Sequence, residues 1–319
     1  MVSRSLVTQL SAVNFMARWN DRKHALVVSC GDAGRAVAQR LSQENYHVTV
    51  ATTKPRRVDE LSRIADRVVV VPQIEAKGDE ELAGCVLRSD LVVLADTIKI
   101  FSPHTFVRTA HRVADVVARS RWPGMLALVS SENAYGCPRR GEALLEDRDV
   151  VHASMRNRTQ WRINTNVMAL QIRHAEAMLR RAQAGRGCLV LRAAGLWDEK
   201  KFFDTAKHNA MRELPLAVGE SLMSFATTNL VAEAVARAAR EGVVGTYNVA
   251  NLPPVRRKDF LRSLQCMYGM QGPVWRDDAE LDPDAMFSID SSPLLPSSQR
   301  GHSRMDCGKL HRVLGLGKI

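Results

Sequence analysis

The sequence SCGDAGRAVAQRL, residues 29–41, follows directly on the apolar run HALVV at residues 24–28. Gly31 and Gly34 stand three residues apart in it, and a helical pattern of apolar residues begins at once after the second glycine. An apolar strand that passes through glycines straight into a helix is the opening unit of an open, parallel α/β sheet. This stretch therefore decides the predicted fold class.

Five more apolar runs repeat this alternation of strand and helix up to about residue 195. They are short, rich in β-branched residues, and separated by segments with the i, i+3, i+4 spacing of one apolar helix face. Together with residues 24–30 they predict six buried strands in a parallel, doubly wound α/β sheet. The five runs are HVTVAT (47–52), DRVVVVP (66–72), DLVVLAD (90–96), MLALVSS (125–131) and CLVLRAA (188–194).

After residue 195 the pattern changes, which indicates a second, smaller domain. Helical patterns cover residues 228–241 and begin again near residue 256, with the short strand GTYNVA between them. The Pro- and Ser-rich segment at residues 290–301 is typical of a loop, and a last helix is expected near DCGKLHRVLG.

The composition is that of a soluble globular protein, with 319 residues of which 45% are hydrophobic. No run reaches the roughly 18 apolar residues of a membrane-spanning helix, so we expect no membrane association and a cytoplasmic location. The first 20 residues lack acids and contain Arg4 and Arg18. This fits a transit peptide or, as the favoured alternative, an irregular N-terminal helix.

The formal net charge of +11 indicates an anionic partner. Lys and Arg are spread along the chain and aromatic residues make up only 5%, so no basic stripe alternates with stacking residues and no nucleic-acid binding is predicted. Anionic small molecules explain the excess charge better. The six cysteines lie far apart without a CxxC pair, so neither a metal site nor a disulfide framework is predicted.

The glycine turn has the chemistry of a phosphate-binding site. A backbone without Cβ atoms can approach a pyrophosphate closely, while N–H groups and the positive end of the following helix stabilise its charge. Ser29 stands in the first position of the usual pattern G-x-G-x-x-G, whose other two positions are Gly31 and Gly34. Asp32 and Ala33 lie inside the turn, and the second strand ends about 20 residues later, as in a dinucleotide site.

The end of the second strand carries cations where an NAD-binding protein would place an acidic residue. A carboxylate there accepts a hydrogen bond from the ribose 2′-hydroxyl, whereas cations favour the 2′-phosphate, so NADP is predicted and NAD is the less favoured cofactor. The alternative is that these are solvated charges that open the next helix. The predicted residues are Thr52, Thr53, Lys54, Arg56 and Arg57, with Ala95 and Asp96 at the end of DLVVLAD completing the cofactor site.

The strand at residues 125–131 runs into LALVSSENAYG, and this segment, with SCGDAGRAVAQRL, LVLRAAGLW and GTYNVAN, resembles the extended and atypical short-chain dehydrogenases/reductases. That superfamily includes NAD(P)-dependent sugar epimerases, dehydratases and reductases. The resemblance covers about residues 24–315 and is most specific at SSENAYG, which is similar to the family's S-S/T-x-x-x-Y-G segment. It implies a Rossmann dinucleotide-binding domain over residues 23–195 that also receives later segments, a small substrate-binding domain over 196–319, and an N-terminal extension over 1–22.

The resemblance also assigns roles to residues after the fifth strand. Ser131 matches the catalytic Ser or Thr of the family, and Tyr135 would hydrogen-bond the carbonyl or hydroxyl of the substrate. Glu132 falls where sugar dehydratases of the family keep an acidic catalytic residue. Taken alone, the pair Ser130 and Ser131 is explained equally well as a cap of the strand-to-loop turn.

The family's Tyr-x-x-x-Lys pair, in which the lysine lowers the pKa of the tyrosine, is missing. In the helix TNVMALQIRHAEAML, Met168 and Ile172 fall at these two positions, and neither side chain can move a proton. His174 points away from both positions by helical geometry and is expected to be exposed. His152, 21 residues after Ser131, is a candidate acid or base, and the alternative is a surface or core histidine without a catalytic role.

Three functions stay open at this point. The first is an NADP-dependent oxidoreductase that transfers hydride between the nicotinamide and a carbonyl, imine or sugar-like small molecule. The second is a dinucleotide-binding sensor or partner protein without turnover. The third is an epimerase or dehydratase with tightly bound NAD(P), in which Glu132 is the acid or base. After the fifth strand, an anionic substrate would suit the arginines at positions 139, 140, 156, 158 and 162, and a solvated basic loop is the favoured alternative. The family commonly forms dimers, so a homodimer is a further prediction.

Overall fold

The computed structural model describes residues 22–71, 76–96, 103–136, 143–146, 160–183, 185–210, 213–220, 222–276 and 304–316. Most of the predicted N-terminal extension, the predicted loop at residues 290–301 and the candidate His152 lie outside these ranges. The chain divides into two compact units. Unit 1 comprises residues 1–130, 171–190 and 232–246, and unit 2 comprises residues 131–170, 191–231 and 247–319.

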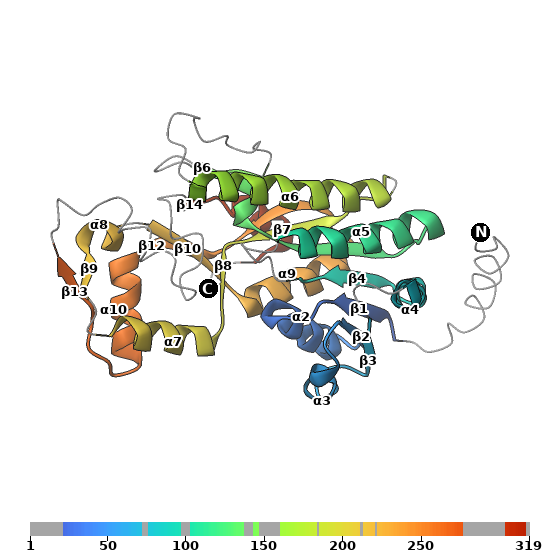
Figure 1. Ribbon diagram of the computed structural model, residues 1–319, viewed down its shortest axis with the longest axis horizontal. Helices are drawn as coiled ribbons and strands as arrows, with labels where there is room; N and C mark the ends of the chain where they lie inside the picture. Colours follow the sequence, from blue (N-terminus) through green and yellow to red (C-terminus); the bar gives the residue numbers. More distant parts are fainter. Residues whose placement is uncertain are drawn as a thin grey trace. The chain divides into compact units, whose positions relative to one another are not determined.

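Unit 1 is organised by a sheet of seven described strands in the order β11-β7-β5-β4-β1-β2-β3 (Figure 1). The order from β3 through β1 to β5 is the doubly wound, Rossmann-type order, in which the strands are added first on one side of β1 and then on the other. This confirms the predicted fold class and all six predicted strands. The strands are β1 (His24–Val28), β2 (His47–Thr52), β3 (Arg67–Val70), β4 (Leu91–Leu94), β5 (Met125–Ser131), β7 (Leu189–Ala193) and β11 (Gly245–Val249).

The central strands are parallel and buried on both faces. Val27 of β1 pairs with Val50 of β2 and with Val93 of β4 in parallel register, and all three side chains are fully buried. Helices that cover both faces of a parallel sheet require apolar side chains on both sides of each strand. This explains why these strands read as continuous β-branched runs rather than as an alternation of apolar and polar residues.

The strand predicted at GTYNVA, in the part of the sequence after residue 195, is β11, and it forms one edge of the same sheet. The N–H of Gly245 donates to the carbonyl of Cys188 at 3.0 Å, and the N–H of Ala194 donates to the carbonyl of Val249 at 2.9 Å. The two bonds join the beginning of β11 to the beginning of β7 and the end of β11 to the end of β7. The two strands are therefore parallel.

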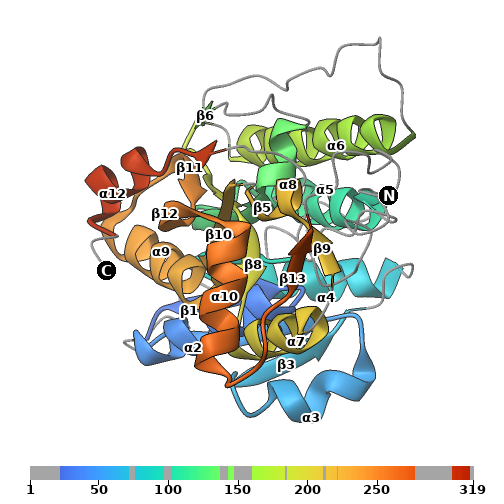
Figure 2. The same ribbon diagram turned by 90° about the vertical axis from the view of Figure 1, so that its left-hand side faces the viewer.

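Helices cover the sheet of unit 1 on both faces. Figures 1 and 2 show α5 and α6 on one face and α2 and α9 on the other. Each helix buries an apolar face, as Val37 and Leu41 of α2 do, and the predicted helix over residues 228–241 is confirmed as α9. The helices are α2 (Asp32–Gln43), α3 (Val58–Leu61), α4 (Ala76–Leu87), α5 (Pro103–Ser120), α6 (Gln160–Ala182) and α9 (Thr228–Glu241). Of the last two, residues 171–182 and 232–241 belong to unit 1.

Unit 2 contains small sheets with the strand orders β12-β10-β8, β13-β9 and β14-β6. Figure 2 looks onto its helix α10. The strands are β6 (Ala143–Leu144), β8 (Gly195–Trp197), β9 (Glu213–Pro215), β10 (Leu222–Thr227), β12 (Asn251–Arg256), β13 (Val274–Arg276) and β14 (Arg304–Met305). The helices are α7 (Glu199–Asn209), α8 (Leu216–Gly219), α10 (Arg257–Met267) and α12 (Gly308–Leu314), and η2 (Glu132–Tyr135) is a 3-10 turn.

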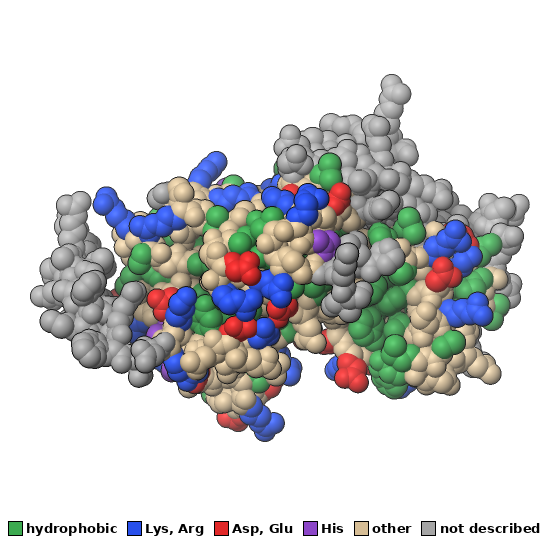
Figure 3. Space-filling view, turned by 180° about the vertical axis from the view of Figure 1, so that it is seen from behind, with side chains coloured by type: hydrophobic (Ala, Val, Ile, Leu, Met, Phe, Trp, Pro, Cys, Tyr) green, Lys and Arg blue, Asp and Glu red, His purple; other side chains and the backbone are tan. Residues whose placement is uncertain are grey.

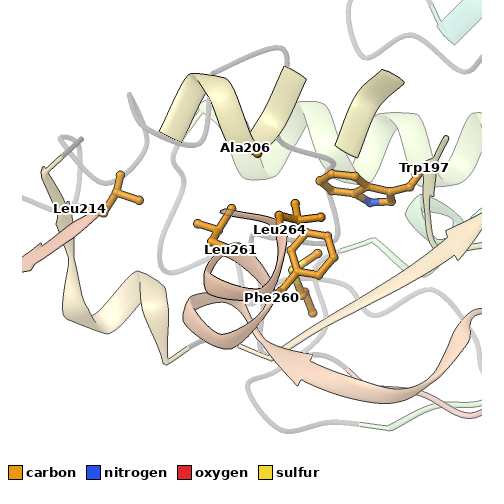
Figure 4. Packing of buried hydrophobic residues seen from close by; sticks show 7 residues of the cluster. Trp197, Ala206, Leu214, Phe260, Leu261 and Leu264 are labelled. Carbon is orange, nitrogen blue, oxygen red and sulfur yellow. The ribbon is translucent and has the colours of Figure 1, made fainter. Parts of the chain in front are cut away.

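The core of unit 2 lies on one face of α10. Phe260, Leu261 and Leu264 of this helix are buried there together with Trp197, whose ring meets Phe260 edge-on at a centroid distance of 5.1 Å (Figure 4). Burying one such side chain stabilises the fold by about 1.5–3 kcal/mol relative to leaving it exposed. The apolar spacing of RRKDFLRSLQCMYG, which predicts this helix, therefore also identifies its buried face.

Residues 131–170 and 191–195 group with unit 2, and Tyr135 is hydrogen-bonded to Asn248 of the same unit. The predicted domain bounds stay a prediction. Within the described residues, no helix is long and apolar enough to cross a membrane.

The charged surface is mixed. On the face shown in Figure 3, Lys and Arg side chains lie among Asp and Glu side chains and do not form one basic stripe. Ion pairs also join α9 to α2 and to the residue after it, since Arg40 lies 2.6 Å from Glu233 and Arg240 lies 3.3 Å from Glu44. The expected absence of nucleic-acid binding, the homodimer and the cytoplasmic location stay predictions.

Candidate functional site

The bend after β1 has the backbone geometry of a glycine-rich turn. Ser29, in the first glycine position, has a φ of +62° and so adopts the left-handed conformation that glycine favours. Its N–H donates to the carbonyl of Ala51 at 3.0 Å, and the N–H of Gly31 donates to the carbonyl of Ser29 at 3.2 Å. Serine therefore replaces the first glycine of the motif, while the backbone keeps the left-handed conformation that a glycine would adopt there.

Helix α2 begins directly after this bend, and no side chain caps its N-terminus. Gly31 is the N-cap residue, Asp32 is exposed in the first turn, and Ala33 is buried. The first N–H groups of a helix lack partners within the helix, and its positive end attracts anions. The backbone at this point therefore suits a phosphate group, with the carboxylate of Asp32 as the one opposing charge in the turn.

Gly34 lets α2 pack closely on the ends of β1 and β4. A Cβ atom at this position would lie 3.0 Å from the carbonyl oxygen of Ser29 and 3.4 Å from the Cβ of Ala95. The third glycine of the dinucleotide pattern serves such close packing of helix on strand. The two glycines therefore have different roles. Gly31 leaves the N-terminus of α2 without a side-chain cap, and Gly34 avoids a clash between α2 and the backbone of Ser29.

The segment after β2 presents its cations in two ways. Thr52 is buried, and its hydroxyl oxygen accepts a hydrogen bond from the N–H of Lys54 at 3.2 Å. Thr53, Lys54 and Arg56 are exposed. The exposure of Lys54 and Arg56 agrees with both explanations of the pattern, a 2′-phosphate site and solvated charges.

Arg57 is fixed against the glycine bend. Its guanidinium donates to the carbonyl of Cys30 at 2.5 Å and makes two parallel hydrogen bonds of 3.1 Å to the carboxylate of Glu60. Arg35, the first residue after Gly34, also pairs with Glu60, at 2.9 Å. Two guanidinium groups thus share the carboxylate of Glu60 beside the bend, and the carboxylate of Asp32 lies in the same first turn of α2.

Sequence reasoning missed Arg35 and Glu60. The spacing of three residues between Arg57 and Glu60 is a helical ion-pair signal that would have found the second of them. Arg35 carries no such signal, because its pairing with Glu60 depends on how α2 and α3 meet in space.

Ala95 and Asp96 follow β4 at the same sheet edge as the bend. The N–H of buried Ala95 donates to the carbonyl of Val28 at 3.0 Å, and the carboxylate of Asp96 accepts a hydrogen bond from the hydroxyl of Thr109 at 3.2 Å. A cavity of about 20 Å³, close to the size of one water, lies at this edge and is lined in part by Ser29, Thr52 and Thr53. The residues predicted to hold the cofactor are therefore brought together within unit 1.

The two serines at the end of β5 have different surroundings. Ser130 is buried, and its hydroxyl donates to the carboxylate of Glu176 at 2.8 Å. Ser131 caps η2, since its hydroxyl oxygen accepts hydrogen bonds from the backbone N–H of Asn133 at 3.2 Å and from the Asn133 amide at 2.9 Å. The capping explanation is confirmed for Ser131. The side chain is partly exposed, so its predicted catalytic role stays open.

Tyr135 is fully buried in unit 2. Its hydroxyl donates to Oδ1 of Asn248 at 2.6 Å, and the guanidinium carbon of Arg192 lies 4.9 Å from the centre of its ring. Burial raises the pKa of Tyr135 above its ordinary value, the opposite of what a proton-exchanging phenol needs. Tyr135 packs as a core residue, and its predicted substrate contact stays untested. Glu132, with 6% of its surface exposed, is also buried.

The positions of the missing catalytic pair are filled with core side chains. Met168 and Ile172 on α6 are buried, with 1% and 0% of their surfaces exposed. His174 is exposed, as predicted. Within the described residues, no group of three or more His, Cys, Asp or Glu side chains is placed to hold a metal ion.

No family model matches the sequence, and no curated protein sequence matches it. Solved structures do share its fold. A putative epimerase from Burkholderia cenocepacia is 18% identical, with a TM-score of 0.68 over 93% of this chain and 92% of that chain. UDP-glucose 4-epimerase from Thermotoga maritima, solved with UDP-glucose, is 16% identical, with a TM-score of 0.68 over 92% of this chain and 93% of that chain.

A hypothetical dTDP-4-dehydrorhamnose reductase from Sulfolobus tokodaii is 11% identical, with a TM-score of 0.64 over 92% of this chain and 97% of that chain. Similarity at these identities establishes the fold over nearly the whole length and does not establish the reaction. The chain therefore has the Rossmann-type α/β fold found in these epimerases and reductases.

Proposed function

We propose that this chain is an NADP-dependent oxidoreductase of the atypical short-chain dehydrogenase/reductase type, acting on a carbonyl, imine or sugar-like small molecule. The observation that carries the proposal is the uncapped N-terminus of α2 at a glycine bend to which Arg57 is hydrogen-bonded. When bound, NADP supplies a hydride donor or acceptor. The fold similarity to epimerases and reductases supports a nicotinamide cofactor, and the cations after β2 support NADP over NAD.

The residues of unit 1 fit the two phosphate groups of such a cofactor differently. Backbone N–H groups at Gly31 and Asp32 suit the diphosphate, because they belong to a helix end that no side chain caps. Lys54 and Arg56 are exposed beside Arg57 and suit the 2′-phosphate. The carboxylate of Glu60 pairs with both Arg57 and Arg35.

The chemistry available to the protein is limited, because Met168 and Ile172 replace the usual proton-exchanging pair with buried apolar side chains. We propose that the Ser131 hydroxyl polarises the reacting group by a hydrogen bond. Holding two reactants in line can lower a barrier by about 7–11 kcal/mol without a strong acid. Such a site favours substrates whose reacting carbon is already electrophilic.

A second candidate is a dinucleotide-binding sensor or partner protein without turnover. It is favoured by Met168 and Ile172 in place of the proton-exchanging pair and by the buried phenol of Tyr135. The third, an epimerase or dehydratase with tightly held cofactor, depends on Glu132, which is buried at the start of η2. Whether the protein releases its cofactor distinguishes the epimerase or dehydratase from the other two candidates. An enzyme that returns the hydride to its own product has no need to exchange NADP.

The test begins with the purified protein and three measurements. Nicotinamide released on denaturation reports retained cofactor, fluorescence titration compares NADPH with NADH, and NADPH oxidation is followed against a panel of carbonyls and imines. We expect no retained cofactor, NADPH bound more tightly than NADH, and oxidation with at least one substrate. If neither NADPH nor NADH binds, the proposal is wrong, whereas binding without oxidation supports the sensor.

Two sets of variants assign the residues. The double change Lys54→Ala and Arg56→Ala should weaken NADPH binding on the order of tenfold and leave NADH binding unchanged, with exposed Arg63→Gln as the control for loss of a nearby surface cation. Equal weakening of both cofactors would contradict 2′-phosphate recognition. Ser131→Ala should lower turnover by about 100-fold to 1000-fold at unchanged NADPH affinity. Unchanged turnover would show that Ser131 is only a cap.

A further inference from the structure

A pocket of about 510 Å³ lies in unit 2 beside α10. Phe260, Leu261 and Leu264 occupy the core face of this helix (Figure 4). Lys258, Arg262 and Gln265 line the pocket, at the spacing of four and three residues that places side chains on one helix face. The volume is in the range of small-molecule sites, about 300–1,000 Å³.

Gln265 is the unusual member of this lining. Only 2% of its surface is exposed, and within the described part of the chain neither its amide oxygen nor its amide nitrogen has a hydrogen-bond partner. A buried amide left without partners is costly, and most such groups in proteins are satisfied by protein, water or ligand. The neighbouring Gly272 leaves room at the oxygen, since a Cβ there would lie 3.3 Å from it. The amide therefore offers one donor and one acceptor side by side.

The charges around the pocket favour an anion. Lys258 is held in an ion pair by Glu220, which also lies 3.3 Å from Arg256. Arg262 is exposed and forms no ion pair within the described ranges. Asp259 supplies the opposing carboxylate of the lining. An acidic group on a ligand would therefore lie toward Arg262 and away from Asp259.

The remaining walls suit a flat ring. Trp275, Met270 and Pro273 also line the pocket, and Trp275 and Met270 pack against the core cluster of unit 2. The indole of Trp275 packs closely on Gly219, where a Cβ would lie only 2.8 Å from the ring. Aromatic rings and thioethers make favourable contacts with flat rings.

We propose that this pocket binds a planar ring that carries a lactam or imide edge and an acidic substituent. The edge presents an acceptor and a donor to the amide of Gln265, the acid pairs with Arg262, and the ring lies against Trp275. The inference is independent of the dinucleotide site, because every residue in it belongs to unit 2 and none is assigned to cofactor or catalysis.

Three probes separate these contributions by isothermal titration calorimetry on the full chain. Orotate has the ring, the imide edge and a carboxylate, whereas uracil lacks the carboxylate and benzoate lacks the imide. We expect orotate to bind on the order of tenfold more tightly than either fragment. If orotate shows no binding at millimolar concentration, or binds no more tightly than benzoate, the proposal is wrong.

Variants locate the binding. Gln265→Leu should weaken orotate on the order of tenfold and leave benzoate unchanged, whereas Arg262→Gln should weaken orotate and benzoate and leave uracil unchanged. Asp259→Asn should strengthen orotate binding. Arg63→Gln, an exposed arginine in unit 1, is the control and should change nothing. Orotate binding that both Gln265→Leu and Arg262→Gln leave unchanged would place it elsewhere and overturn the inference.

The melting temperature supplies a readout independent of ligand. Replacing an unpartnered buried amide by an apolar group of similar size should leave Gln265→Leu at least as stable as the parent chain. A clear loss of stability would show that the amide is satisfied structurally, which contradicts its role as a ligand group. If Gln265→Leu loses stability, Arg262→Gln still tests orotate binding, because it changes only an exposed side chain.

Discussion

The carbonyl oxygen of Ser29 lies 3.0 Å from the point where a Cβ on Gly34 would stand. This close approach exists because Ser29 keeps the left-handed backbone of a glycine, with φ at +62°, and turns its carbonyl toward the first turn of α2. The two residues together set how near the helix end comes to the strand end. The proposed diphosphate site depends on that distance.

Gly34→Ala should therefore destabilise the protein by about 1–3 kcal/mol, because the new methyl group meets a backbone oxygen that cannot rotate away. NADPH affinity should fall as well. Gly84→Ala is the control, since on α4 the added Cβ approaches only the flexible end of Arg88, at 3.3 Å. That change should stabilise by about 0.5–1 kcal/mol. Urea unfolding measures both, and an unaffected Gly34→Ala would contradict the packing argument.

Ser29→Gly should stabilise the protein by about 1 kcal/mol, because glycine adopts a positive φ without the steric cost that an L side chain carries. Ser29→Ala keeps that cost and should show no gain. The comparison isolates backbone strain from the loss of the hydroxyl. Equal unfolding midpoints for the glycine and alanine variants would show that the bend is unstrained.

Local pattern predicts the sheet and the bend, and it does not predict the long-range pairings. The β-branched runs identify the six predicted strands because apolar residues fill most positions of each run. Five of these are inner strands, whereas β3 is the edge opposite β11 and buries only Val69 fully. The edge strand β11 is held through Gly245 and Cys188, 57 residues earlier in the chain, and no local signal records such a pairing. The same holds for the Tyr135–Asn248 bond and for the unpartnered amide of Gln265.

Tyr135→Phe separates the structural role of this residue from the predicted catalytic one. Removing the hydroxyl leaves buried Oδ1 of Asn248 without its donor, so we expect a loss of about 1–3 kcal/mol in unfolding free energy. Turnover per folded molecule should be unchanged. A variant that is as stable as the parent chain and has lost turnover would restore Tyr135 to the active site and contradict this account.

The stability of unit 1 should depend on pH through His24. Burial lowers the pKa of His24, and the ring of His47, at a centroid distance of 4.9 Å, lowers it further, as does Arg22, while Asp90 and Asp66 oppose the shift. The unfolded chain therefore binds a proton at higher pH than the folded chain does. Unfolding free energy should fall as pH decreases below 6.5, the ordinary pKa of histidine, and stay level above it.

His24→Gln isolates this contribution. Urea unfolding at intervals between about pH 5 and about pH 8 should show a weaker acid-side loss in the variant than in the parent chain. Exposed His174→Gln should leave the parent profile unchanged. Parallel profiles for the parent chain and His24→Gln would show that the proton is taken up elsewhere.

A crystal structure of the protein grown with NADP⁺ tests the central claim most directly. We predict that the diphosphate lies on the N–H groups at the start of α2, beside Gly31 and Gly34, and that the 2′-phosphate contacts Lys54, Arg56 or Arg57. An empty bend in crystals that hold millimolar NADP⁺, or a dinucleotide bound with its phosphates away from α2, would contradict the account.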